Sequence, residues 1–179
     1  ELADDLIVDP ARSFFGDISA PLVDHYDFHQ ITKDLAGLST FFPTARSVVK
    51  SDPSPEDWNV QYLATSSTSS WAETAYREKR VNRDDDEAGG PLGLAAVVEP
   101  KTPGTGKGRL VIVGDAGLVE NALLNSVRGS VGNLDLFMNA VSWLAEEEEL
   151  ISIRPKPPEQ RQVVLTAPQA RGIIYSSII

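Results

Sequence analysis

Hydrophobic and polar residues along this chain fall into short blocks that predict strands first and helices later. Continuous apolar runs at residues 92–100 and 109–115 are typical of buried strands, the second being rich in β-branched residues. Shorter runs at residues 4–10, 46–50 and 60–65 predict further strands, and residues 24–32 alternate as an edge strand or extended segment would. Residues 150–156 and 162–166 favour late strands.

Helical spacing dominates residues 132–149, and a shorter helix is expected at residues 116–126. Asn133 is a good candidate for the cap of the long helix. Ser70 and Glu73 stand at capping-box spacing, which favours another short helix there. The apolar positions of the long helix recur every three or four residues: Leu134, Phe137, Met138, Val141 and Leu144.

Strands that alternate with helices predict an α/β layered domain with a mainly parallel or mixed sheet. The chain has 179 residues, of which 41% are hydrophobic and 23% charged, as expected for one globular domain. Its net charge of −10 argues against nucleic-acid binding. Because it has no cysteine, disulfides, thiolate zinc sites and thiol nucleophiles are excluded.

The stretch TPGTGKGRLVIVGD, at residues 102–115, looks like a phosphate-binding loop but has its parts in the wrong order. A P-loop places its glycines between a strand and a helix, with a hydroxyl residue after the lysine. Here Gly108 follows Lys107, and the glycines stand before the strand. We therefore expect a hairpin connection between two strands and no nucleotide.

Polar residues that follow predicted strands are the candidates for a binding site. Asp115 follows the strand at 109–115 directly, and Thr65 and Ser66 end the strand at 60–65. Ligands of open α/β sheets bind beyond the carboxyl ends of strands, so we expect these residues to border one cleft, with Trp71 as a wall. His29 is a further candidate, and an enzyme would have its site around Asp115, Thr65 and His29. The alternative for Asp115 is a turn or helix cap, and for Trp71 a core residue.

Two histidines offer candidate chemistry. In an extended strand His25, Asp27 and His29 would share one face, which could hold a divalent metal, but no fourth ligand is identifiable and a polar edge segment is the alternative. Ser66, Ser67 or Ser70 could serve a hydrolase with either histidine as base, although the usual G-x-S-x-G motif is missing. We predict no catalytic residue, no metal and no cofactor.

Several phrases together resemble one family, the GldG-like auxiliary components of ABC transporters known from gliding motility. They are LADDLIVDP, HQITKDLAGLSTFFPTARSV, LATSSTSSWAET, GRLVIVGDAGLVENALL and GNLDLFMNAVSWLAEEEELISIRPKPPEQRQVVLT. The resemblance covers nearly the whole chain except residues 77–107. It implies a Rossmann-type, glutamine-amidotransferase-like fold, of which this chain would be an incomplete, C-terminal portion.

The resemblance also implies a location and partners. Residues 1–153 would form an extracytoplasmic, periplasmic domain, residues 154–166 a juxtamembrane spacer, and residues 167–179 the start of a membrane-proximal helix. The expected partners are the permease and ATPase subunits of a transporter, and the expected role is contact or substrate presentation without catalysis. A hydrolase or amidotransferase-like enzyme and a carbohydrate-binding domain are the alternatives.

Overall fold

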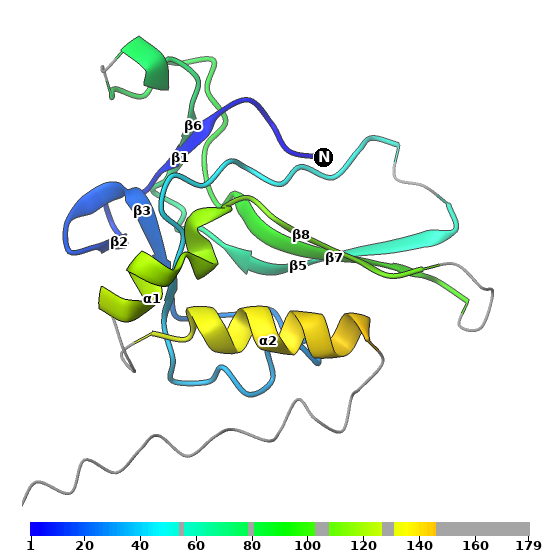
Figure 1. Ribbon diagram of the computed structural model, residues 1–179. Helices are drawn as coiled ribbons and strands as arrows, with labels where there is room; N and C mark the ends of the chain where they lie inside the picture. Colours follow the sequence, from blue (N-terminus) through cyan, green and yellow to red (C-terminus); the bar gives the residue numbers. More distant parts are fainter. Residues whose placement is uncertain (54–55, 79–80, 103–107, 127–130, 146–179) are drawn as a thin grey trace, which may run out of the picture.

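The computed structural model describes residues 1–145, apart from residues 54–55, 79–80, 103–107 and 127–130 (Figure 1). Its strands and helices, in chain order, are β1 (Leu6–Val8), β2 (Ser13–Phe14), β3 (Asp17–Val23), β4 (Thr40–Phe41), β5 (Trp58–Thr65), β6 (Trp71–Glu73), the 3-10 helix η1 (Tyr76–Glu78), β7 (Gly93–Pro100), β8 (Leu110–Val113), the 3-10 helix η2 (Gly117–Val119), α1 (Asn121–Ser126) and α2 (Asn133–Leu144).

The strands form three small sheets, β1-β6, β2-β3-β4 and β5-β7-β8. Every pairing within them is antiparallel. The predicted Rossmann-type, parallel or mixed α/β sheet is therefore wrong. A parallel pair needs a crossover of a dozen residues or more, usually a helix, whereas both α-helices here come after the last strand of the sheet. The regular alternation of strand and helix that the sequence suggested does not occur in residues 1–145 as far as they are described.

Most of the predicted strands are confirmed. The runs at residues 4–10, 60–65, 92–100 and 109–115 contain β1, β5, β7 and β8. β7 and β8 are consecutive antiparallel neighbours, as the hairpin interpretation of the glycine-rich stretch required. Residues 24–32 form no strand: Tyr26 makes an isolated bridge with Ala64, and only residues 30–32 are turn. The runs at 150–156 and 162–166 lie outside the described part of the chain.

Residues 42–48 cross the molecule and join the sheets, although they are not a regular strand. Val48 makes only isolated bridges, one with Leu2 and one with Gly93. The Arg46 N–H donates to the Gly114 carbonyl at 2.9 Å. A side chain on Gly114 would place its Cβ 2.0 Å from the Arg46 carbonyl oxygen, so this crossing requires glycine. The predicted strand at 46–50 is thus a connector that seals one end of β8.

The predicted helix after Ser70 is also wrong, because residues Trp71–Glu73 form β6. Glu73 is fully buried in the β1-β6 pair, opposite Leu6. Its Oε1 accepts a hydrogen bond from the Ala75 N–H at 2.9 Å. Ser70 and Glu73 thus have the spacing of a capping box, but Glu73 lies in a strand and accepts its hydrogen bond from the residues that follow that strand.

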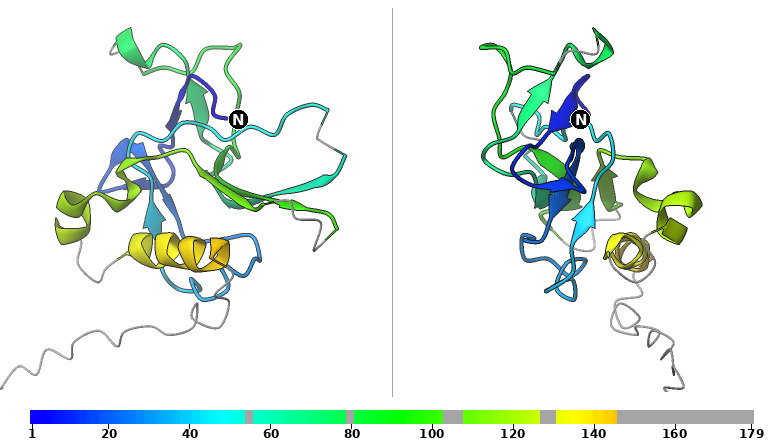
Figure 2. Two further views of the ribbon diagram at one scale, coloured as in Figure 1. Left: turned by 45° about the vertical axis from the view of Figure 1, so that its right-hand side comes forward. Right: turned by 90° about the vertical axis from the view of Figure 1, so that its left-hand side faces the viewer.

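The hydrophobic core joins the β5-β7-β8 sheet and α2 to buried residues of other segments, among them Ile7, Val23, Ile31 and Phe42. Figures 1 and 2 show α2 packed alongside this sheet. β7 is the central strand, and its residues 93–97 are buried. From α2, Leu136, Ala140 and Trp143 enter the core. The helix itself was predicted correctly, but the face that it turns toward the sheet is not its most apolar one.

Asn133 begins α2 but does not cap it. The cap position is occupied by Gly132, and the Asn133 side chain is fully buried. Its Oδ1 accepts from the Phe41 N–H at 3.1 Å, and its Nδ2 donates to the Phe41 carbonyl at 2.9 Å and to the Leu118 carbonyl at 3.2 Å. The predicted cap is therefore a buried clamp that ties the helix to β4 and η2.

Candidate functional site

The predicted strand-end residues lie at one end of the sheet but line separate hollows. β5 and β8 flank β7 and run in the same direction, so Thr65 and Asp115 both stand at their carboxyl ends. Asp115 lines a hollow of about 630 Å³. Thr65 and Ser66 line another, of about 420 Å³. The single cleft expected between them does not form.

The larger hollow is bordered by the turn after β8, by the crossing segment and by the chain around η2. It is lined by Leu2, Pro43, Thr44, Arg46, Val113, Gly114, Asp115, Ala116, Gly117, Glu120 and Leu123. Thr44 has a φ of 59°, the left-handed region that β-branched residues seldom adopt. Strained backbone of this kind is concentrated at functional sites.

Asp115 is the buried acid of this hollow, with only 8% of the residue exposed. Its Oδ1 accepts a hydrogen bond from the Gly117 N–H at 2.7 Å, as in the turn-forming alternative. Its Oδ2 is buried with no hydrogen-bond partner among the residues that the structure describes. Burial raises the pKa of Asp115 from its ordinary 3.8 to about 6, against the effect of the Gly117 bond and with that of the Glu120 charge.

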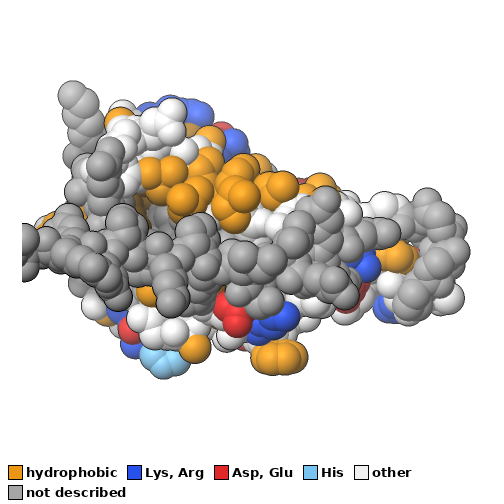
Figure 3. All heavy atoms as spheres, turned by 60° about the horizontal axis from the view of Figure 1, so that its bottom comes forward, with side chains coloured by type: hydrophobic (Ala, Val, Ile, Leu, Met, Phe, Trp, Pro, Cys, Tyr) orange, Lys and Arg blue, Asp and Glu red, His pale blue; other side chains and the backbone are white. Residues whose placement is uncertain are grey.

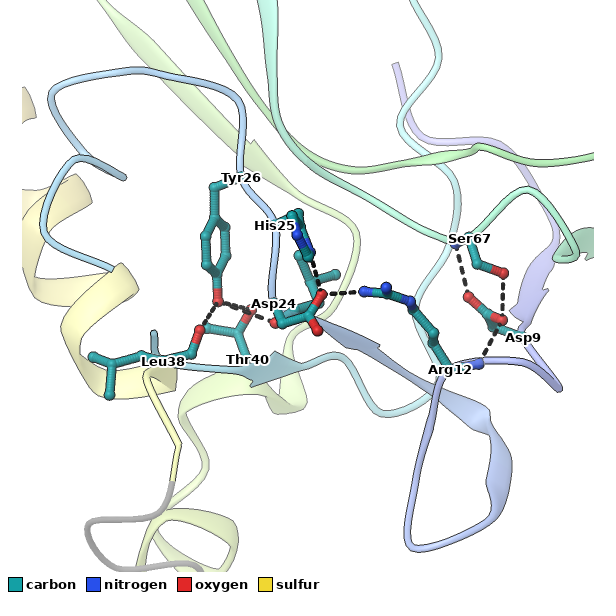
Figure 4. Close-up of polar contacts among 9 residues, drawn as sticks. Asp9, Arg12, Asp24, His25, Tyr26, Leu38, Thr40 and Ser67 are labelled. Carbon is teal, nitrogen blue, oxygen red and sulfur yellow. Dashed lines mark hydrogen bonds and ion pairs between the residues drawn. The ribbon is translucent and has the colours of Figure 1, made fainter. Parts of the chain in front are cut away.

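The smaller hollow carries an exposed ionic cluster (Figure 4). Arg12 forms an ion pair with Asp24, and Nδ1 of His25 lies 2.6 Å from the same carboxylate oxygen. The hydrogen bond from His25 lowers the pKa of Asp24, and the Arg12 charge adds to this effect. Side-chain exposure is 44% for Arg12 and Asp24 and 83% for His25, so solvent screens the cluster.

The serines beside this hollow are engaged in structural hydrogen bonds. Ser67 Oγ donates to Asp9 Oδ1 at 2.7 Å (Figure 4). Ser66 Oγ lies 2.6 Å from Ser70 Oγ, which also donates to the Ser67 carbonyl at 2.8 Å. These contacts fold the loop between β5 and β6. They give the hydrolase alternative no serine bonded to an imidazole in the described part of the chain.

The two histidines point to different surroundings, so the shared strand face predicted for them does not exist. The His29 ring packs edge-on against Trp143, with ring centroids 5.1 Å apart, and its Nδ1 accepts from the Ile31 N–H at 3.2 Å. Burial lowers the pKa of His29. Within the described residues no group of three or more His, Asp or Glu could hold a metal ion.

Trp71 is set apart from Asp115 by the topology, because it belongs to the β1-β6 pair. Its indole N–H donates to Glu73 Oε2 at 3.3 Å, and the residue is half-buried. This position agrees only in part with the alternative of a core residue, because Trp71 is half-buried.

Sequence reasoning missed the most conspicuous surface, which is the outer face of α2. Its five large apolar residues are each 41–50% exposed, and Figure 3 shows a band of hydrophobic side chains on the side of the molecule that carries α2. They are the same residues whose spacing predicted the helix: Leu134, Phe137, Met138, Val141 and Leu144. The signal was present in the sequence, but such a stripe ordinarily faces the core.

An apolar groove joins this face to the sheet. It has a volume of about 130 Å³ and is walled by side chains of α2 and of β8. The α2 wall includes Phe137, Val141 and Leu144, and the β8 wall Val111 and Val113. Contiguous exposed apolar surface of this kind marks contact sites in soluble domains. We refer to the five α2 residues together with this groove as the α2–β8 surface.

Comparisons with protein-family models, with curated proteins and with solved structures found no match for this chain. The resemblance to GldG-like auxiliary components therefore stays a prediction from the sequence. No helix within the described residues is long and apolar enough to cross a membrane. The proposed spacer at 154–166 and membrane-proximal helix at 167–179 lie outside those residues.

Proposed function

We propose that this chain is a non-catalytic recognition domain of a membrane ABC transport system, and that it acts by protein–protein contact through the α2–β8 surface. The transport role, the extracytoplasmic location and the permease and ATPase partners come from the sequence resemblance. The mode of action is supported by one observation: the most apolar face of the longest helix is turned outward.

This observation favours binding because exposure of that face has no benefit for the isolated fold. Burying an apolar side chain contributes roughly 1.5–3 kcal/mol, so five half-exposed ones represent a stabilisation that the domain forgoes. The opposite face of α2 is complete without them, since it buries Trp143 and uses Asn133 and Asn139 in specific hydrogen bonds. A partner that covers the outer face would recover the missing contribution.

Capture of the tagged full-length protein from solubilised membranes of its host tests this proposal. We expect transporter subunits to be recovered with the unaltered protein and, at about tenfold lower yield, with a Phe137→Ser, Val141→Ser double variant. Phe15→Ser is the matched control, because Phe15 is 93% exposed at the β2–β3 turn and should not affect recovery. Absence of transporter subunits, or equal recovery with all variants, would contradict the proposal.

A second candidate function is favoured by the hollow at Asp115. A buried carboxylic acid with a raised pKa, at a strand end and beside strained backbone, is a common feature of enzyme sites. The hydrolase-like alternative is therefore supported by Asp115 and not by the serines. If it holds, Asp115→Asn abolishes a hydrolytic activity of the purified protein on a panel of ester and amide substrates. A recognition domain shows no such activity in either form.

A further inference from the structure

The two edge strands of the β5-β7-β8 sheet differ in whether other described segments cover them. The chain around Tyr26 covers the outer edge of β5: Tyr26 forms a bridge with Ala64, and the Asp27 N–H donates to the Leu63 carbonyl at 3.2 Å. Register irregularities between Tyr62 and the residues after it also interrupt β5. Covering segments and bulges are devices by which natural sheets prevent their edges from pairing with other chains.

Among the described residues, the outer edge of β8 has none of these protections. Its residues, Leu110–Val113, are Leu-Val-Ile-Val, with no charge and no proline, and their register with β7 is regular. None of the residues that the structure describes pairs with the outer side of this strand. Leu110 is 51% exposed. An uncharged, apolar and open edge is a template for another strand.

The pairing with β7 fixes which backbone groups face the open side. The Gly114 N–H donates to the Leu94 carbonyl at 2.9 Å. Because hydrogen-bonded and non-hydrogen-bonded pairs alternate in an antiparallel ladder, Ile112 also directs its N–H and carbonyl toward β7. Val111 and Val113 then direct theirs outward. The side chains of these two valines line the groove beside α2, so one incoming segment would meet both features.

We propose that β8 receives an added strand from a partner polypeptide, an extended, uncharged segment whose alternate apolar side chains enter the groove between β8 and α2. This inference rests on the proposed function and specifies the partner. The outward N–H and carbonyl groups of Val111 and Val113 demand an extended backbone. The groove walls, Phe137, Val141 and Leu144 on one side and the two valines on the other, demand aliphatic side chains.

A proline at Val111 tests the added strand separately from the helix face. Val111→Pro removes an N–H that faces the open edge and leaves the bonds to β7 in place. Val111→Ala is the matched control, because it keeps the N–H and shortens the side chain. In the membrane capture experiment we expect Val111→Pro to reduce partner recovery about tenfold and Val111→Ala to reduce it only about two- to threefold. Circular dichroism establishes that both variants are folded.

Amide hydrogen exchange of the unaltered protein gives a readout that does not depend on the variants. In the captured complex the Val111 and Val113 amides should exchange at least tenfold more slowly than in the isolated protein. The added strand is refuted if Val111→Pro does not reduce partner recovery, or if the two amides are not protected in the complex, while the Phe137→Ser, Val141→Ser variant still loses the partner. The proposed function would stand in that case. If neither variant loses the partner, the proposed function fails as well.

Two further outcomes would assign the edge to a different occupant and so overturn the inference. Protection of Val111 and Val113 that is present in the isolated protein and lost on deletion of residues 146–179 would show that the chain covers its own edge. Protection that rises with protein concentration, together with a dimer by light scattering, would show that a second copy does. The inference requires fast exchange of both amides in the isolated protein.

Discussion

The two faces of α2 differ in how they are used: one is packed into the fold, and the other is the surface that we propose binds a partner. The inner face is the less apolar of the two, yet it is fully packed: Leu136 and Trp143 enter the core, and Asn133 makes three hydrogen bonds to the chain around it. The outer face has more hydrophobic residues, yet each of its five large apolar side chains is 41–50% exposed. Apolar character alone does not decide which side of a helix is buried.

Asp115, at the end of β8, resembles the outer face of α2 in that its placement does not favour the stability of the isolated domain. Asn133 and Asp115 are both buried polar groups, but every side-chain hydrogen-bonding atom of Asn133 has a partner, while Oδ2 of Asp115 has none among the described residues. An unpaired buried carboxylate lowers stability. Positions that cost stability are expected where a domain serves something other than its own folding.

The largest difference between the faces should appear at the end of α2, where Trp143 is buried and the next residue, Leu144, is 41% exposed. Trp143→Ala should lower the free energy of unfolding by about 3–5 kcal/mol. It removes a side chain that is 3% exposed and that contacts the His29 ring and the Arg109 guanidinium. Leu144→Ala, on the outer face, should cost less than about 1 kcal/mol. Urea unfolding curves measure both, and equal losses would contradict the assignment of faces.

The next effect concerns the polar groups of the inner face. Asn133→Ala leaves the Phe41 N–H and two carbonyls without their partner and should cost about 2–3 kcal/mol. Asn139→Ala removes one described bond, from Nδ2 to the Ile31 carbonyl at 2.9 Å, and should cost about 1 kcal/mol. Thermal melts of the two variants check this order. A reversed order would mean that Asn133 is not the clamp of α2.

Asp115→Asn should stabilise the protein, by about 2 kcal/mol at pH 7. The folded state binds the Asp115 proton more tightly than the unfolded chain does, since its pKa is about 6 instead of 3.8. The contribution of this group is therefore full below pH 4 and is lost as the pH rises to about 6. The stabilisation by asparagine should accordingly vanish near pH 3.5. Unfolding curves across this pH range provide the measurement, and a pH-independent gain would contradict the raised pKa.

The smallest effect is expected for polar substitution of the outer face. Leu134→Gln and Met138→Gln remove side chains that are each 50% exposed, so the free energy of unfolding should change by less than about 1 kcal/mol. The same variants should raise solubility, because they interrupt the apolar band. Chemical denaturation and precipitation assays test the two statements. A large loss of stability would show that this face is packed in the isolated protein.

Local patterns in the sequence predicted local structure well and the arrangement of the elements poorly. Continuous apolar runs predicted β7 and β8, and helical spacing predicted α2. Both signals depend on residues only a few positions apart. The direction of pairing depends on which elements lie between the strands, and the apparent alternation misled on that point. The capping-box spacing at Ser70 was overridden by the pairing of β6 with β1.

The candidate site shows the same division. Asp115 could be singled out because a polar residue that follows an apolar strand is a local signal. That its hollow is separate from the one at Thr65 depends on which distant segments line each of them, and no local pattern specifies this. The outer face of α2 was visible in the sequence as a stripe, but only the packing of Leu136 and Trp143 reveals that the stripe faces outward.

Site-specific photo-crosslinking tests most directly the claim that the outer face of α2 is a contact surface. A benzoylphenylalanine is placed at Phe137 or, as control, at Phe15, in the full-length protein within its native membranes, and adducts are identified by mass spectrometry. The account predicts a transporter subunit crosslinked at Phe137 and not at Phe15. Equal labelling at both positions, or no adduct at Phe137, would contradict it.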